Sequence, residues 1–218
     1  GLFSSQVNVS GTLKKPQLSG LFNLSDVALT SDSLPETLDT IARDGVVRQY
    51  QMSYQGVFTS DGGQASLNGD LNWQDDWILN TSLSSEAFNI TPQSGVSLTI
   101  KPNLTLQLSQ GFADVSGTFE IPHARIKIDA LPESATSVSS DAKIIGDESA
   151  TDEAPWNYEV NIELILGDDV HFRGFGVNTY LTGQLLLRQQ IGRMLGGKGE
   201  INTENGFYTI FGQRLTIK

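Results

Sequence analysis

The segment GQASLNGDLNW, residues 63–73, alternates strictly between two kinds of side chain. Its odd-numbered positions are apolar or glycine, and the positions between them are glutamine, serine, asparagine or aspartate. Successive side chains of a β-strand point to opposite faces of the sheet, so this segment has one apolar and one polar face. The pattern predicts a strand whose apolar face needs a cover.

The same two-residue period recurs along most of the chain. It returns over residues 50–58, 104–108, 115–121, 158–166 and 181–187. Turn signals such as Asp61-Gly62 and Asn205-Gly206 separate the segments. We expect an all-β fold of about fourteen strands, and open sheets of that width usually curl. Glycines also lie on the apolar face, where the missing side chain either lets the sheet bend or another surface approach, or is merely tolerated: Gly69, Gly117 and Gly183.

Only one short segment favours a helix. Ser33 is a candidate cap, Pro35 falls in the first turn, and Leu34, Leu38 and Ile41 share a side before Gly45. A helix of this length plugs one end of a sheet but does not cover it. The sheet therefore either folds onto itself or leaves an apolar trough.

Composition limits the class of protein. The 218 residues carry a net charge of −11 with no basic stripe, which argues against nucleic acid as a partner. The lack of cysteine excludes disulfides and thiolate chemistry and fits an extracytoplasmic compartment. The uniform pattern predicts a single domain over residues 1–218. The acidic run over residues 131–155 breaks that pattern and predicts a mobile loop.

Catalytic and metal-binding patterns are weak in this chain. His123 and His171 are the only histidines, and His171 follows Asp168 and Asp169 without a further residue spaced to complete a metal site. No nucleophile elbow, phosphate loop or dinucleotide fingerprint is present. We therefore expect no enzyme activity, no catalytic residues, no cofactor and no metal.

Three passages together resemble one family. They are GTLKKPQLSGLFNLSDVAL from residue 11, VSGTFEIPHARIKI followed by LPESATSVSSD, and LGDDVHFRGFGVNTYLTGQLLL continuing through GEINTENGFYTIFGQRLTIK. These passages resemble the carboxy-terminal conserved domain of the TamB family, the inner-membrane subunit of the bacterial translocation and assembly module. The resemblance covers most of the chain, and its closing signature is fairly specific.

The resemblance implies a large curled β-sheet that forms an open, taco-like half-pipe with an apolar interior. It also implies the periplasm of a Gram-negative bacterium, with the full-length protein anchored in the inner membrane. The partner it implies is the outer-membrane barrel TamA, contacted through regions partly outside this chain.

Two functions use the same apolar face. The first is a groove that shields lipid acyl chains and carries phospholipid between the inner and outer membranes. The second is a chaperone-like scaffold that holds unfolded strands of outer-membrane β-barrel proteins and autotransporters during assembly. A third possibility is a structural β-sandwich or β-solenoid that simply spans distance and whose own side chains fill its interior.

The groove hypothesis assigns acyl-chain binding, or detergent binding in vitro, to a set of apolar residues along the alternating segments. These are Tyr50, Met52, Tyr54, Leu67, Leu71, Trp73, Leu104, Leu106, Leu108, Val115, Phe119, Ile126, Ile128, Val160, Ile162, Leu164, Leu185 and Leu187.

Overall fold

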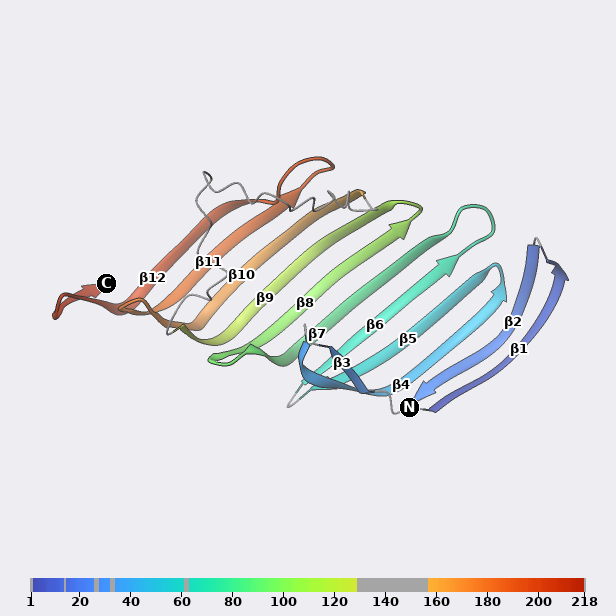
Figure 1. Cartoon of the computed structure of the whole chain (residues 1–218), viewed down its shortest axis with the longest axis horizontal. Coiled ribbons are helices and arrows are strands. Elements are labelled where there is room, and N and C mark those ends of the chain that lie inside the picture. Colours follow the sequence, from blue (N-terminus) through green and yellow to red (C-terminus); the bar gives the residue numbers. More distant parts are fainter. Residues whose placement is uncertain are drawn as a thin grey trace, which may run out of the picture.

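The chain forms one open β-sheet, shown in Figure 1 as a computed structural model. The structure describes residues 2–13, 15–25, 28–31, 34–60, 63–128 and 157–217, and their side chains except those of residues 24–43 and 60. The acidic loop predicted over residues 131–155 lies outside the described residues.

Thirteen strands make up the described part of the sheet. They are β1 Leu2–Thr12, β2 Lys15–Ser25, β3 Ala28–Ser31, β4 Leu34–Gln49, β5 Gln51–Ser60, β6 Gly63–Asn72, β7 Ile78–Gln93, β8 Val96–Ser109, β9 Phe112–Ile128, β10 Asn157–Gly174, β11 Val177–Gln189, β12 Gly196–Ile210 and β13 Gln213–Ile217. No helix occurs within these ranges. The all-β prediction is confirmed.

Strand order follows the sequence from β1 to β13, except that β3 pairs only with β4, at one end of it. All neighbours are antiparallel apart from β9 and β10, which run parallel. Twelve strands lie side by side along this path, and at about 4.8 Å per strand they extend roughly 50 Å.

The prediction of a short helix from Ser33 to Gly45 is wrong, because residues 34–45 belong to β4, and Ser33 itself lies outside the described residues. The strand pairs with β5 on one side and with β2 and β3 on the other. Isolated helices of this length are marginal in water, and β-branched residues such as Thr37, Thr40 and Ile41 favour a strand. Backbone pairing on both sides therefore outweighs the local helix signals.

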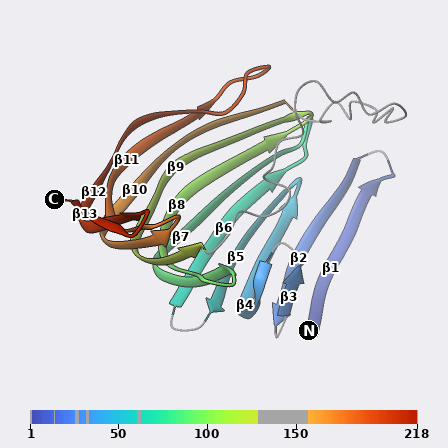
Figure 2. The same cartoon turned by 60° about the vertical axis from the view of Figure 1, so that its left-hand side comes forward.

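A line of register shifts crosses the sheet where its strands bend. Shifts interrupt the pairing of β4 with β5 and every pairing from β6–β7 to β11–β12. Such bulges bend a strand and increase its twist. We call this line the crease, and the sheet on either side of it the two arms. Figures 1 and 2 show the strands curving along their length into an open half-pipe.

The crease also holds most of the nearly fully buried apolar side chains among the described residues. One apolar side chain on each of five successive strands is less than a tenth exposed there: Ala65, Phe88, Ile100, Ala124 and Val170. The first three form a cluster against which Leu83 and Phe119 pack. Side chains on the inside of a bend are crowded together, so the face that carries these residues is the interior of the half-pipe.

Candidate functional site: the apolar trough

The inner face of the half-pipe is lined by apolar side chains that adjacent strands place side by side. Met52 of β5 pairs with Leu71 of β6, Leu71 with Leu79 of β7, and Leu79 with Leu108 of β8. Directly paired residues share a face of the sheet. A second row runs from Leu106 to Val115 and Val160. We call the inner face the trough.

The structure brings most of the predicted groove residues together in the trough. By strand register, the residues on this face are Met52, Tyr54, Leu67, Leu71, Leu104, Leu106, Leu108, Val115, Phe119, Ile126, Ile128, Val160, Ile162, Leu164, Leu185 and Leu187. Tyr50 and Trp73 lie instead just beyond the ends of strands, where the Trp73 amide donates a hydrogen bond of 2.9 Å to the Tyr50 carbonyl.

Apart from Val47 of β4, which is 6% exposed, the apolar side chains on the arms of the trough are mostly half-buried. Leu104, Leu106 and Leu108 are of intermediate exposure, whereas the alternating residues Asn103, Thr105 and Gln107 are exposed. Among the described residues no helix or second sheet packs over these leucines. Contacts between strands that are not neighbours join β4 to β7, three places along the sheet, and β5 to β7, two places along. The arms therefore present apolar surface that the described chain leaves open.

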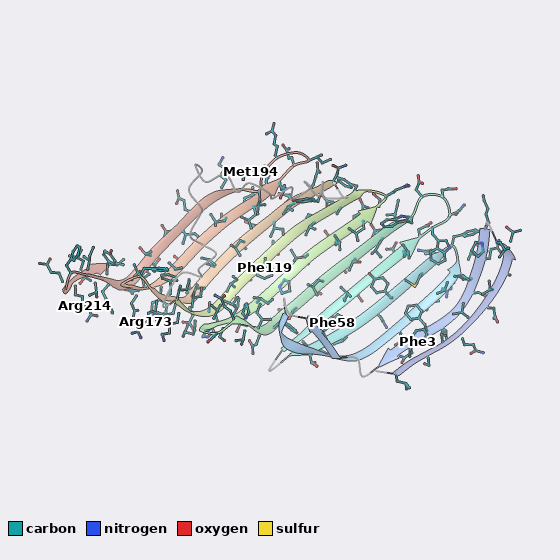
Figure 3. The ribbon with its side chains drawn as sticks, in the orientation of Figure 1. Phe3, Phe58, Phe119, Arg173, Met194 and Arg214 are labelled. Carbon is teal, nitrogen blue, oxygen red and sulfur yellow. The ribbon has the colours of Figure 1, made fainter. Side chains whose placement is uncertain are left out.

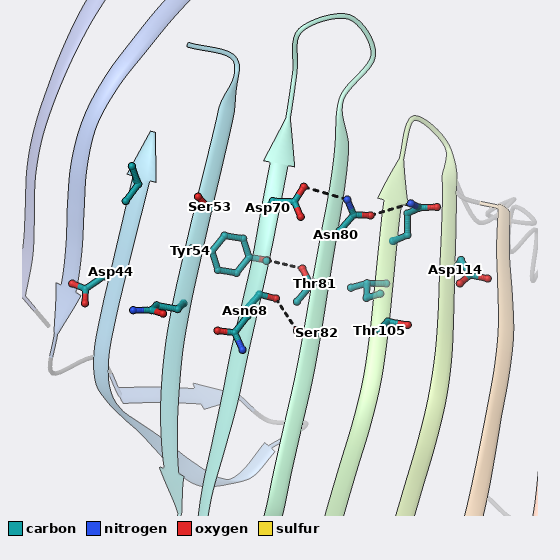
Figure 4. Close-up of a pocket in the computed structure, with 15 residues that line it drawn as sticks. Asp44, Ser53, Tyr54, Asn68, Asp70, Asn80, Thr81, Ser82, Thr105 and Asp114 are labelled. Carbon is teal, nitrogen blue, oxygen red and sulfur yellow. Dashed lines mark hydrogen bonds between the residues drawn. The ribbon is translucent and has the colours of Figure 1, made fainter. Parts of the chain in front are cut away.

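A polar pair lies within the trough, between β5 and β7. The Tyr54 and Thr81 hydroxyls are 2.5 Å apart and share a hydrogen bond that passes over Gly69 of the strand between them (Figure 4). A Cβ at Gly69 would lie 2.4 Å from the Tyr54 hydroxyl, so only glycine lets the ring lie flat. This glycine is required by packing, which decides between the two alternatives for Gly69.

The outer face is polar and is joined by side-chain hydrogen bonds between strands. Asn80 donates to Asp70 at 3.2 Å, and Gln107 donates to Asn80 at 2.9 Å (Figure 4). These residues line a hollow across the middle strands, together with Ser53 and Asn68. By register Asp70, Asn80 and Gln107 lie on the opposite face from Tyr54 and Leu106, although Tyr54, Thr81 and Leu106 also border this hollow.

A charged cluster on the outer face braces the crease between β9 and β10. His123 Nδ1 is 2.6 Å and Arg125 Nη1 is 2.8 Å from the Asp169 carboxylate. Hydrogen bonds from Arg125 and then His123 lower the pKa of Asp169. Asp169 lies more than forty positions after His123 and Arg125 and meets them because β9 and β10 pair in parallel, so no local pattern predicts this cluster.

The second histidine is engaged separately. His171 Nε2 is 2.8 Å from Asn178 Oδ1, and the His171 ring packs against Tyr180 with centroids 5.1 Å apart. In the part of the chain that the structure describes, no three His, Asp or Glu side chains gather in a way that could hold a metal ion.

The trough contains further apolar residues that were not among the predicted groove residues. They are Leu79, Leu83, Phe88, Ile90, Leu98, Ile100, Leu166, Val170, Phe172 and Leu181. Leu166 and Leu181 lie in the alternating segments 158–166 and 181–187, so the alternation could have identified them. Others were hidden because a bulge moves the apolar positions from odd to even numbers, as between Leu83 and Phe88 in β7.

Fold and site together define a class of protein: a single open β-sheet, curled around an apolar trough. The family model for the TamB C-terminal domain matches residues 51–218. This match covers well over half of the chain, and the chain therefore belongs to the TamB family, as the resemblance indicated.

A curated relative supports the same assignment. The translocation and assembly module subunit TamB of Haemophilus influenzae is 29% identical over 232 residues, which cover 98% of this chain. The chain spans 18% of the length of that relative. A comparison with solved structures gives no significant match. Within the described residues, no helix has the length and hydropathy needed to cross a membrane.

Proposed function

We propose that the trough shields the acyl chains of phospholipids as they pass between the inner and outer membranes. The observation that carries this proposal is the open apolar surface on the arms, formed by side chains such as Leu106 and Ile162. Each CH₂ group removed from water contributes about 0.8 kcal/mol, so an acyl chain of some sixteen carbons needs roughly 12 kcal/mol of shielding to cross an aqueous space. A continuous apolar surface provides it without any chemical step.

The direction of the trough supports this proposal. Because each strand bends at the crease, the half-pipe runs across the strands, from β4 toward β12. Its length therefore grows with the number of strands, and a longer chain with the same repeat extends the same surface. In this proposal the full-length protein is anchored in the inner membrane, spans the periplasm and meets the outer-membrane barrel TamA through regions partly outside this chain.

A direct test measures what the purified chain carries. We expect phospholipid in its organic extract by mass spectrometry, or detergent when the chain is purified in detergent. A chain that stays monomeric in detergent-free buffer with no bound amphiphile contradicts the proposal, because an uncovered trough is expected to hold an amphiphile or pair with a second copy.

Paired substitutions on one strand make the test specific. Leu106→Glu places a charge in the trough, whereas Asn103→Glu places the same charge on the outer face of the same strand. We expect the first variant to lose bound phospholipid and the second to retain it, both remaining folded by circular dichroism. Equal lipid content in the two folded variants contradicts the proposal.

The second candidate is a scaffold for unfolded outer-membrane strands. It is favoured by β1, whose residues Leu2–Thr12 are all exposed and which pairs, among the described strands, on one side only. Photocrosslinkers at positions 106 and 162 separate the two functions. Crosslinks to lipid support transport, and crosslinks to polypeptide support the scaffold.

A further inference from the structure

The loop between β11 and β12, residues 190–195, carries apolar side chains into solvent. Met194 is 92% exposed, and Ile191 and Leu195 are 51% and 55% exposed. Connecting turns usually consist of glycine, proline and polar residues, because apolar side chains gain nothing from exposure to water. Figure 3 shows Met194 at the tip of this loop, beyond the ends of the neighbouring strands. Nothing in the fold of the described residues requires apolar side chains here.

The backbone holds this loop as a defined turn. The Arg193 amide donates a hydrogen bond of 2.9 Å to the Gln190 carbonyl, and Gly192 adopts a φ of 71°. The strands that lead into and out of the turn pair up to Arg188 and Gly196. The apolar side chains are therefore displayed on a short, supported hairpin end.

The charge around this loop is opposite to that of the whole chain. The chain has a net charge of −11, yet the stretch from Val177 to Gly199 contains no aspartate or glutamate. The same stretch contains Arg188, Arg193 and Lys198, and all three are exposed. By register, Arg188 and Lys198 lie on the outer face of the sheet, beside the apolar tip.

We propose that the loop formed by residues 190–195 inserts its apolar tip into the surface of an anionic phospholipid bilayer. Exposed apolar side chains flanked by Lys and Arg fit a bilayer surface, where the apolar groups enter the acyl boundary and the cations meet headgroup phosphates. An acidic partner protein would also pair with the cations, but a specific protein interface buries about 1,000 Å² or more, which a six-residue tip does not offer. The loop lies at the rim of the trough and docks that rim against the membrane.

This inference is independent of transport through the trough, and each can fail without the other. Leu106→Glu alters the trough and leaves the loop intact, so we expect that variant to lose bound lipid and still bind vesicles. Loop substitutions are expected to reduce vesicle binding without changing the lipid content of the extracted chain.

Vesicle flotation tests the inference with the whole 218-residue chain. We expect the chain to float with vesicles containing one quarter phosphatidylglycerol and much less with vesicles of phosphatidylcholine alone. Arg193→Glu should weaken binding about fivefold or more, since it replaces a cation by an anion at the surface, and Arg193→Lys should leave binding unchanged. Met194→Asp should reduce it at least as strongly.

A matched control lies on the opposite rim. Phe211, at the β12–β13 turn, is 98% exposed, about as much as Met194. Phe211→Ser therefore removes an equally exposed apolar side chain that lies outside the proposed loop. We expect this variant to bind like the original chain. If Phe211→Ser and Met194→Asp lose vesicle binding equally, the chain adheres to vesicles unspecifically. If Arg193→Glu and Met194→Asp bind vesicles like the original chain, the membrane contact lies elsewhere. Either result overturns the inference.

The absence of native cysteine allows a second readout. Met194→Cys, labelled with an environment-sensitive fluorophore, should shift its emission to the blue on addition of phosphatidylglycerol vesicles, and Phe211→Cys should not. A blue shift at position 211 alone, or at neither position, contradicts insertion of the loop.

Discussion

The crease and the arms of the half-pipe contain the same kinds of side chain but bury them differently. Phe88 and Val170 at the crease are 6% and 1% exposed, whereas Leu106 on an arm remains partly open to solvent. All three belong to the same apolar face. Apolar alternation therefore identifies the face but does not distinguish core residues from residues that are available to a ligand. The position of the bend makes that distinction.

The largest expected effect is the loss of a buried aromatic side chain at the crease. Phe88→Ala leaves a cavity beside Ala65 and Ile100, and we expect it to lower the free energy of unfolding by about 3–5 kcal/mol. Leu106→Ala on an arm should cost about 1 kcal/mol, because little surface is buried there. Urea denaturation measures both. If both variants lose the same free energy of unfolding, side chains at the crease do not contribute more to stability than side chains on the arms.

A smaller effect is expected from a side chain added beside the crease. Gly183 has a φ of 131°, and a Cβ there would lie 2.2 Å from the carbonyl oxygen of Glu200 in β12. Since the obstacle is backbone, Gly183→Ala should displace β12 and cost about 2–3 kcal/mol.

Gly192 provides the control for that substitution. It also has a positive φ, of 71°, but a Cβ there meets no atom within 4 Å. Gly192→Ala should therefore lower the free energy of unfolding by about 1 kcal/mol, which is the cost of holding a non-glycine residue at a positive φ. Thermal unfolding of both variants, compared with the original chain, separates steric displacement from backbone preference. If the two variants lose the same free energy of unfolding, the close approach of β12 to Gly183 does not contribute to the cost of Gly183→Ala.

The smallest effect is expected on the outer side of the crease. The pKa of Asp169 is lowered in the folded chain by hydrogen bonds from Arg125 and His123. Its contribution to stability is therefore present above the unfolded pKa of about 4 and is lost as the pH falls through the lower folded value. Asp169→Asn should lower the unfolding midpoint at neutral pH, and the difference should shrink under acid conditions.

Glu159→Gln, on the outer face of the same strand, is the control for Asp169. It should leave the pH dependence of the unfolding midpoint close to that of the original chain. If the difference in unfolding midpoint between Asp169→Asn and the original chain does not change with pH, the charge of the carboxylate does not stabilise the crease.

Side-chain alternation was enough to predict the all-β fold and most of the trough. Leu104, Leu106 and Leu108 occupy alternate positions in one unbroken strand, so their shared face follows from the backbone repeat alone. The helix expected from Ser33 failed because cap and proline signals are local, whereas pairing with β5 is not. Long-range partners outweighed local preference.

The crease and the charged cluster could not be predicted from one sequence. A bulge changes which positions face the trough, and its place depends on the register of the neighbouring strand. His123 and Asp169 meet through parallel pairing of β9 with β10, which no local pattern specifies. The Tyr54–Thr81 bond likewise depends on the absence of a side chain at Gly69, one strand away.

The parallel pairing of β9 with β10 bears on the order in which the sheet assembles. From β4 to β9, and again from β10 to β13, each strand pairs with the one that follows it in the chain. Contacts between such neighbours form quickly, because little chain entropy is lost in closing a short turn. We therefore expect two meanders to fold first and to join along their shared seam last. Hydrogen exchange measured during refolding should protect the amides at that seam after all others.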